Sequence, residues 1–266
     1  MNQAVNGNIK IGNTDMDYIS FGSGTRNLIM LPGLGDGLKT VKGTASAFAM
    51  MYRRYAKNYK VYVFSRKNQL ETGYSTRDMA RDQATAMKEL GIYNADIIGI
   101  SQGGMIAQYF AIDYPEMIRK LILTVTISRQ NKTIQETIGN WIKIAETGNY
   151  KELMIDTAEK MYTEKYLKRY RRFYPILGKM GDTDDFERFL IQAWACLQHD
   201  AYEELAKIKC PTLVIGADQD RVLEGESSKE ISERISGSEL VMYEGYGHGV
   251  YEEAKDFHDK VLDFLA

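Results

Sequence analysis

Residues 97–103 read Ile-Ile-Gly-Ile-Ser-Gln-Gly, which places a serine between two glycines directly after a short apolar run. The apolar run predicts a strand buried on both faces, and residues 105–114 predict a helix that stops before Pro115. A serine on such a tight strand-to-helix turn stands exposed at the helix N-terminus, where developing negative charge is stabilised. We therefore interpret Ser101 as a candidate nucleophile, with a purely structural turn as the alternative.

Strand and helix patterns alternate on both sides of this turn, which is typical of a parallel sheet with helices on both faces. A short edge hairpin is expected before the alternation begins, with Gly12-Asn13 at its turn. The expected strands are residues 9–11, 18–21, 28–31, 61–64, 97–100, 121–125, 212–215 and 240–243. The expected helices are residues 41–57, 75–90, 105–114, 227–235 and 250–265.

The alternation stops after Ile127 and returns at the strand expected over residues 212–215. Between them, residues 128–200 show only helical periodicity. We therefore expect an α/β core made of residues 1–127 and 201–266, with residues 128–200 as a helical insertion.

Composition narrows the class of protein. The 266 residues are 44% hydrophobic and 26% charged, as in an ordinary globular chain. The net charge of −2 gives no general attraction to nucleic acid or to an anionic membrane, and no apolar stretch is long enough to span one. Only two cysteines occur, so we expect a cytoplasmic protein without disulfides. The three histidines and two cysteines form no metal-binding pattern, so we expect neither a metal nor another cofactor.

A serine nucleophile needs a base, and three histidines are available. His248 lies in a glycine-flanked loop between the last expected strand and the last expected helix, at the carboxyl end of the sheet. We therefore assign His248 as the base. His199, at the end of the insertion, and His258, within the last helix, are interpreted as structural residues.

The base needs a carboxylate to orient its ring, and two candidates follow the strand over residues 212–215. These are Asp218 and Asp220, and either side chain could instead cap the loop.

A tetrahedral intermediate also needs two backbone N–H donors. We expect one from Gln102, directly after the serine, and one from Leu34 in the glycine-rich loop over residues 32–37. A dinucleotide-binding loop is disfavoured because the G-x-G-x-x-G spacing is missing and no acid ends the strand near Phe64.

With these residues in place, the chain resembles the α/β-hydrolase family over nearly its whole length outside the insertion. The order Ser101, Asp220, His248 is the family's order, and Asp220-Arg221-Val222 matches its pattern in the last acid loop. The resemblance therefore implies Asp220 rather than Asp218. The loop after the fourth parallel strand, an alternative source of the acid in this architecture, has no carboxylate over residues 126–129. One departure is that Pro32-Gly33 stands where many members have His-Gly.

The resemblance implies a serine hydrolase, and we expect it to cleave carboxylic esters of small or medium apolar acyl groups. A thioester, a lactone, a C–C bond or a peptide remains an alternative substrate for the same groups. A non-catalytic ligand receptor on this fold is the alternative from another class.

Family members place a helical lid at the point of this insertion, so the resemblance implies that residues 128–200 are a lid. Two further patterns occur in it. Tyrosines recur at 162, 166, 170 and 174 among lysines and arginines, and we interpret them as the core-packed face of an amphipathic lid helix rather than as a nucleic-acid surface. An apolar underside of the lid that adapts to acyl groups is expected from Trp141, Met154, Met161 and Trp194.

Overall fold

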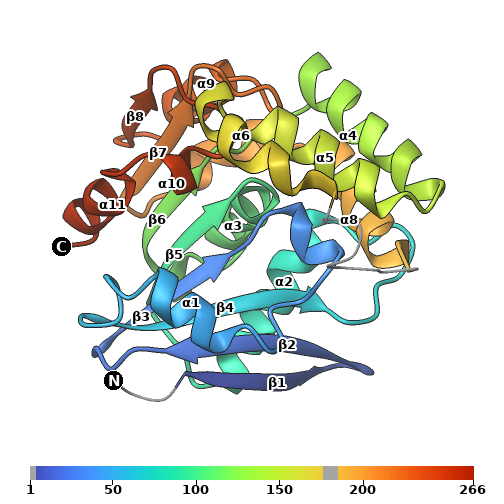
Figure 1. Cartoon of the computed structure of the whole chain (residues 1–266). Helices are drawn as coiled ribbons and strands as arrows, with labels where there is room; N and C mark the ends of the chain where they lie inside the picture. The colour runs from blue at the N-terminus through green and yellow to red at the C-terminus, as the bar shows by residue number, and fades with distance from the viewer. Residues whose placement is uncertain (1–3, 176–184) are drawn as a thin grey trace.

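The computed structural model describes residues 4–175 and 185–266, and these form an eight-stranded sheet covered by helices (Figure 1). The strand order is β1-β2-β4-β3-β5-β6-β7-β8. The six strands from β4 to β8 are parallel, whereas β1 and β2 are antiparallel additions at one edge. The strands are β1 (Val5–Ile11), β2 (Thr14–Phe21), β3 (Arg26–Leu31), β4 (Tyr59–Lys67), β5 (Ala95–Ile100), β6 (Ile118–Thr124), β7 (Thr212–Ala217) and β8 (Glu239–Tyr243).

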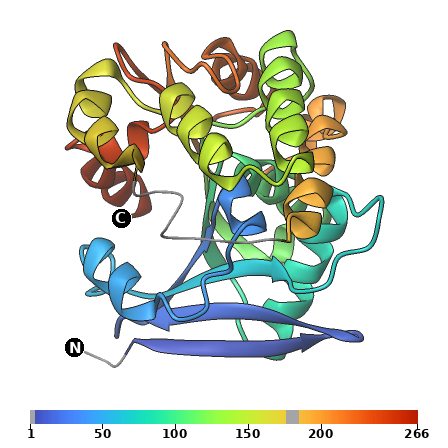
Figure 2. The ribbon, with the colours of Figure 1, turned by 45° about the vertical axis from the view of Figure 1, so that its right-hand side comes forward.

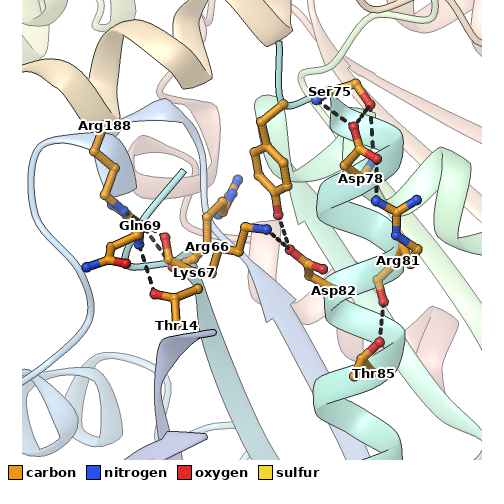
Figure 3. Close-up of polar contacts among 11 residues, drawn as sticks. Thr14, Arg66, Lys67, Gln69, Ser75, Asp78, Arg81, Asp82, Thr85 and Arg188 are labelled. Atoms are coloured by element: carbon orange, nitrogen blue, oxygen red, sulfur yellow. Dashed lines mark hydrogen bonds and ion pairs between the residues drawn. The ribbon is translucent and has the colours of Figure 1, made fainter. Parts of the chain in front are cut away.

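The hairpin predicted at the edge is present, and Ile11 pairs with Thr14 across a two-residue turn in which Gly12 has φ of +60°. The helix predicted after Ser75 also begins there. The Ser75 hydroxyl accepts from the N–H of Asp78, and the Asp78 carboxylate accepts from the N–H of Ser75, as Figure 3 shows.

Helices cover both faces of the sheet, as the alternating pattern predicted. One apolar cluster joins the sheet to α2, α3 and α9, and a second joins its other face to α1, α10 and α11. The helices of the core are α1 (Ala45–Met51), α2 (Thr76–Glu89), α3 (Gln102–Asp113), α9 (Glu226–Arg234), α10 (Val250–Glu253) and α11 (Phe257–Leu265), with the 3₁₀ turns η1 (Leu34–Gly37), η2 (Pro115–Met117) and η4 (Tyr202–Lys207).

Between β6 and β7, the described residues 128–175 and 185–211 contain helices and turns but no strand. The helices α4, α5 and α6 lie together at the end of the molecule opposite the β1–β2 hairpin (Figures 1 and 2). A third apolar cluster joins this group to the core through Leu34, Met105 and Val222. The described helical segments between β6 and η4 are α4 (Lys132–Glu146), α5 (Tyr150–Met161), α6 (Glu164–Tyr170), η3 (Arg171–Phe173) and α8 (Glu187–Leu197).

Two predicted helices were too long. The one expected over residues 41–57 is only α1, which starts later because the N–H of Val41 bonds to the Ser65 hydroxyl and Gly43 adopts φ of +81°. It also ends earlier, at Met51. The one expected over residues 250–265 is two helices, because Ala254 is extended between α10 and α11. The helix expected from residue 105 begins earlier, at Gln102.

The tyrosine stripe does not form one face of a single helix. α5 ends at Met161, and the Thr163 side chain caps the separate helix α6. The ring of Tyr166 stacks on the rings of Tyr162 and Tyr170, with centroids 4.6 and 4.4 Å apart. Tyr170 is 44% exposed, so the predicted packing of this stripe onto the core is wrong at that residue.

Candidate active site

Ser101 occupies the turn between β5 and α3, as its sequence context predicted. Its φ and ψ are +55° and −119°, a strained backbone for a residue other than glycine. The turn is held because the carbonyl of Ser101 accepts hydrogen bonds from the N–H of Gly104 and the hydroxyl of Thr126, both at 2.8 Å. Strain kept in place by surrounding contacts is typical of a functional position.

The two glycines of the motif are required by close packing. A Cβ added to Gly103 would lie 1.9 Å from the carbonyl oxygen of Leu31, and one added to Gly99 would lie 2.5 Å from that of Gly103. The first turn of α3 therefore rests directly on the backbone of β3 and β5. This contact explains the G-x-S-x-G spacing without reference to catalysis.

The structure brings His248 and Asp220 together from different loops. The Nδ1 atom of His248 lies 2.8 Å from Oδ2 of Asp220, and the side chains are 4% and 3% exposed. The other carboxylate oxygen of Asp220 accepts from the N–H groups of Val222 and Leu223 at 2.8 and 3.0 Å. The carboxylate is thereby fixed toward the imidazole ring.

Asp218, the other acid considered, does something different. Its Oδ1 atom accepts from the N–H of Gly245 at 2.7 Å, so this side chain links the loop after β7 to the turn after β8. It is exposed, in contrast to the buried Asp220. The geometry thus pairs the histidine with the acid that the resemblance implied.

The two expected oxyanion donors begin helical segments. Leu34 is the first residue of η1 and Gln102 is the first residue of α3. The N–H of a first helical residue has no acceptor within its own helix, so it is free to bind another oxygen. Gly33, which precedes Leu34, lies against Ser101, since a Cβ there would be 3.3 Å from the serine Cβ.

A cavity of about 410 Å³ joins these residues, because Ser101, His248 and Leu34 all line it. Most of its remaining wall is apolar. The core contributes Phe48 and Val41 among others, and the inserted helices contribute Trp141, Met154, Met161 and Phe189. Three of the four residues expected on the lid's underside are therefore in this wall.

Trp194 is the exception, since it is 50% exposed and does not line this cavity. It lies on the exposed side of α8.

The other two histidines have structural partners, as interpreted from the sequence. His199 is buried, with Nδ1 2.9 Å from the Thr76 hydroxyl and Nε2 3.2 Å from Oε1 of Gln108. His258 lies 2.9 Å from the hydroxyl of Tyr55. Burial lowers the pKa of His199 to about 3 and also lowers that of His258.

One polar group next to this cavity carries no local sequence signal. Asp36, in η1, is buried and pairs with Arg188 of α8 at 2.6 Å, although 152 positions separate them. A contact over that distance in sequence has no periodicity or spacing by which it could be recognised.

None of the helices in residues 4–175 and 185–266 is both long and apolar enough to cross a lipid bilayer. Over the same residues, no group of three or more histidine, cysteine, aspartate or glutamate side chains is arranged to hold a metal ion.

Comparison with known proteins identifies the class. Residues 27–255 match the family model of the alpha/beta hydrolase fold. The chain is 25% identical to a putative carbamate hydrolase RutD of Rhizobium rhizogenes, with 90% of this chain and 92% of that protein covered. It is 26% identical to a 2-hydroxy-6-oxononadienedioate/2-hydroxy-6-oxononatrienedioate hydrolase of Klebsiella pneumoniae, with 92% and 88% covered.

Solved structures share the fold. An alpha/beta hydrolase from a Medee basin deep-sea metagenome superimposes with a TM-score of 0.85 at 22% identity, with 97% of each chain covered. The enol-lactonase of Burkholderia xenovorans LB400 gives 0.82 at 22% identity, with 97% of this chain and 99% of that chain covered. The chain belongs to the alpha/beta hydrolase fold family, and its general class is that of a hydrolase.

Proposed function

We propose that this chain is a serine hydrolase that cleaves carboxylic esters of small to medium apolar acyl groups through an acyl-enzyme intermediate. One observation carries the proposal. Ser101, held in a strained turn, and His248 line the same largely apolar cavity, and Nδ1 of His248 is hydrogen-bonded to the buried Asp220.

The proposed reaction uses these groups in a fixed order. The hydroxyl of Ser101 attacks the ester carbonyl, and Nε2 of His248 takes its proton and gives it to the leaving alcohol. Asp220 holds the ring through Nδ1 and stabilises the imidazolium. The N–H groups of Leu34 and Gln102 bind the oxyanion. Water then attacks the acyl-enzyme with His248 as the base, which releases the acid and restores the serine.

The substrate class follows from the cavity. An apolar space of about 410 Å³ next to the nucleophile suits an alkyl acyl chain better than a charged one. We propose residues 128–200 as the lid over a core of residues 1–127 and 201–266, since α4, α5 and α8 supply one wall of the cavity. We further propose a cytoplasmic protein, for which the two free cysteines, Cys196 and Cys210, are the support.

Hydrolysis of p-nitrophenyl esters from acetate to dodecanoate tests the proposal. Ser101→Ala should lower turnover at least about a thousandfold, whereas Ser23→Ala, in an exposed loop, should leave it unchanged. Turnover that survives in Ser101→Ala would exclude the acyl-enzyme route.

A second candidate is the same groups acting on a lactone or a C–C bond, and the relatives named as an enol-lactonase and as a dienedioate hydrolase favour including it. Covalent labelling of Ser101 by a fluorophosphonate without ester turnover would support this candidate. If the protein shows neither labelling nor turnover, a ligand receptor is supported instead.

A further inference from the structure

Three polar residues recur every four positions along the inserted helix α8: Arg188, Gln192 and Cys196. Residues four apart lie on the same face of a helix. This face is directed at both segments that carry the proposed oxyanion donors, the η1 turn with Leu34 and the start of α3.

At one end of the face, Arg188 binds the η1 turn and the end of β4. Its guanidinium donates to the carboxylate of Asp36 at 2.6 Å and to the carbonyl of the same residue. It also donates to the carbonyls of Arg66 and Lys67, at 2.8 and 3.2 Å. Figure 3 shows Arg188 extending from α8 toward these two residues. The side chains of Arg188 and Asp36 are 14% and 0% exposed, so this ion pair is weakly screened by solvent.

Asp36 connects this pair to the rest of the turn over residues 32–37, which carries Leu34. Its carboxylate also accepts from the N–H of Arg66 at 3.0 Å, and the Arg66 guanidinium donates to the carbonyl of Pro32. Burial lowers the pKa of Arg66, and the Asp36 carboxylate opposes this change. The two ends of the turn, on either side of Leu34, are therefore held by charged groups.

At the other end of the face, α8 binds the residue that follows the nucleophile. The side-chain amide of Gln102 donates to the carbonyl of Gln192 at 2.9 Å and to the sulfur of Cys196 at 3.2 Å. Burial raises the pKa of the Cys196 thiol to about 12, so the sulfur stays a neutral acceptor. Gln102 and Gln192 are fully buried, which leaves the amide little freedom to rotate.

We propose that Arg188 is a positioning residue that, through Asp36, uses helix α8 to set the N–H of Leu34 opposite the N–H of Gln102 in the oxyanion hole. The inference rests on the proposed function. It assigns α8 a role in catalysis besides that of covering the cavity.

The physical reason is the rigidity of the helix. Donors must lie 2.7–3.1 Å from the oxyanion, and loss of one donor costs on the order of 10²–10³ in turnover. η1 is a short turn of four residues, and the N–H of its first residue has no acceptor within the turn. α8 lies against it, since a Cβ on Gly37 would be 2.8 Å from Cα of Phe189. A helix bound to both segments fixes their separation.

Kinetics of Arg188 variants on p-nitrophenyl butyrate test the proposal, with active sites counted by fluorophosphonate titration. Arg188→Met should lower kcat per titrated site by at least about tenfold and change KM by less than about threefold. Arg188→Lys should recover part of the loss, because an ammonium can still donate to Asp36. Arg171→Met is the matched control, since Arg171 is an exposed arginine of the insertion that binds Glu159 and Glu164.

Two readouts separate positioning from a general loss of structure. The affinity for butylboronic acid, which forms a tetrahedral adduct with the serine, should fall by the same factor as kcat/KM. In a double-mutant cycle, Arg188→Met with Asp36→Asn should be no worse than the poorer single variant, because both changes break one pair.

The proposal is overturned if Arg188→Met keeps the kcat of the control, or if its whole loss lies in KM or in the number of titratable sites. It is also overturned if boronic acid affinity is unchanged. If Ser101→Ala retains turnover, the proposed function itself is wrong. If Ser101→Ala is inactive but Arg188→Met is normal, only the positioning role is wrong.

Discussion

Lowering the pH should destabilise this protein through one buried histidine, His199. Both nitrogens of its neutral ring have a hydrogen-bond partner. The amide of Gln108 donates to the carbonyl of Ile127, so its oxygen faces His199 and accepts the proton on Nε2, while Nδ1 accepts from the hydroxyl of Thr76. A protonated ring would bring a charge into a site that is 1% exposed, where water cannot solvate it. For this reason burial lowers the pKa of His199 to about 3.

The direction in which stability changes with pH depends on whether the folded or the unfolded chain binds the proton. Between pH 3 and the ordinary value of 6.5, the unfolded chain protonates His199 and the folded chain does not. Stability is therefore full above pH 6.5 and is lost as the pH falls below it. At pH 5, about 1.5 units below 6.5, the loss is about 2 kcal/mol at 1.36 kcal/mol per unit. This figure does not depend on the exact folded pKa, provided that it lies below about 4.

Urea unfolding at pH 7.5 and pH 5 measures this loss. The wild-type protein should lose about 2 kcal/mol more of its unfolding free energy between the two pH values than His199→Gln, which has no titrating group. Comparing pH differences cancels the cost of the substitution itself, and the acidic residues titrate in both proteins. A difference below about 0.5 kcal/mol would refute the reasoning, because a ring with an unshifted pKa contributes nothing. Ring ¹⁵N shifts should show His199 still neutral at pH 5.

Three further outcomes are expected. Asp220→Asn should lower kcat by about 10²–10⁴, whereas Asp218→Asn should lower it less than about tenfold, and ester kinetics showing the reverse order would mean that the acid is misassigned. Gly103→Ala should destabilise the fold by at least about 3 kcal/mol in urea unfolding, because the added Cβ meets a β3 carbonyl at 1.9 Å. Gly139→Ala in α4, where a Cβ meets nothing within 4 Å, should be neutral or stabilising by up to about 1 kcal/mol, and equal effects at the two sites would contradict this reading. Met154→Trp adds bulk to the cavity wall and should shift the preferred p-nitrophenyl ester to a shorter acyl chain, so an unchanged chain-length profile would place the acyl group elsewhere.

The sequence predicted those features that depend on neighbours in the chain. Apolar runs identified the six parallel strands, and weak alternation around Gly12-Asn13 identified the edge hairpin. The glycines around Ser101 identified the turn, because a strand, a tight turn and a helix start are each specified within a few residues. The loop position of His248 followed from the same alternation. Helix ends were predicted less well. The helix expected over residues 41–57 is shortened by a hydrogen bond from Val41 to Ser65 on another element, which no local pattern contains.

The choice between Asp218 and Asp220 shows where local information ends. The two acids are two positions apart in one loop, and local pattern left both open, whereas the family resemblance implied Asp220. In the fold, the N–H groups of Val222 and Leu223 turn the Asp220 carboxylate toward His248, whereas the N–H of Gly245 holds the Asp218 carboxylate.

Tertiary structure also determined which residues of the inserted helices line the cavity and what lies behind the η1 turn. Trp141 and Trp194 look equally suitable in the sequence, yet only the first lines the cavity. Asp36 and Arg188 meet across 152 positions of chain. The physical reason is the same in each case: local patterns specify what an element is and which of its faces is apolar, but its partners are fixed only when distant segments pack and bury their charges together.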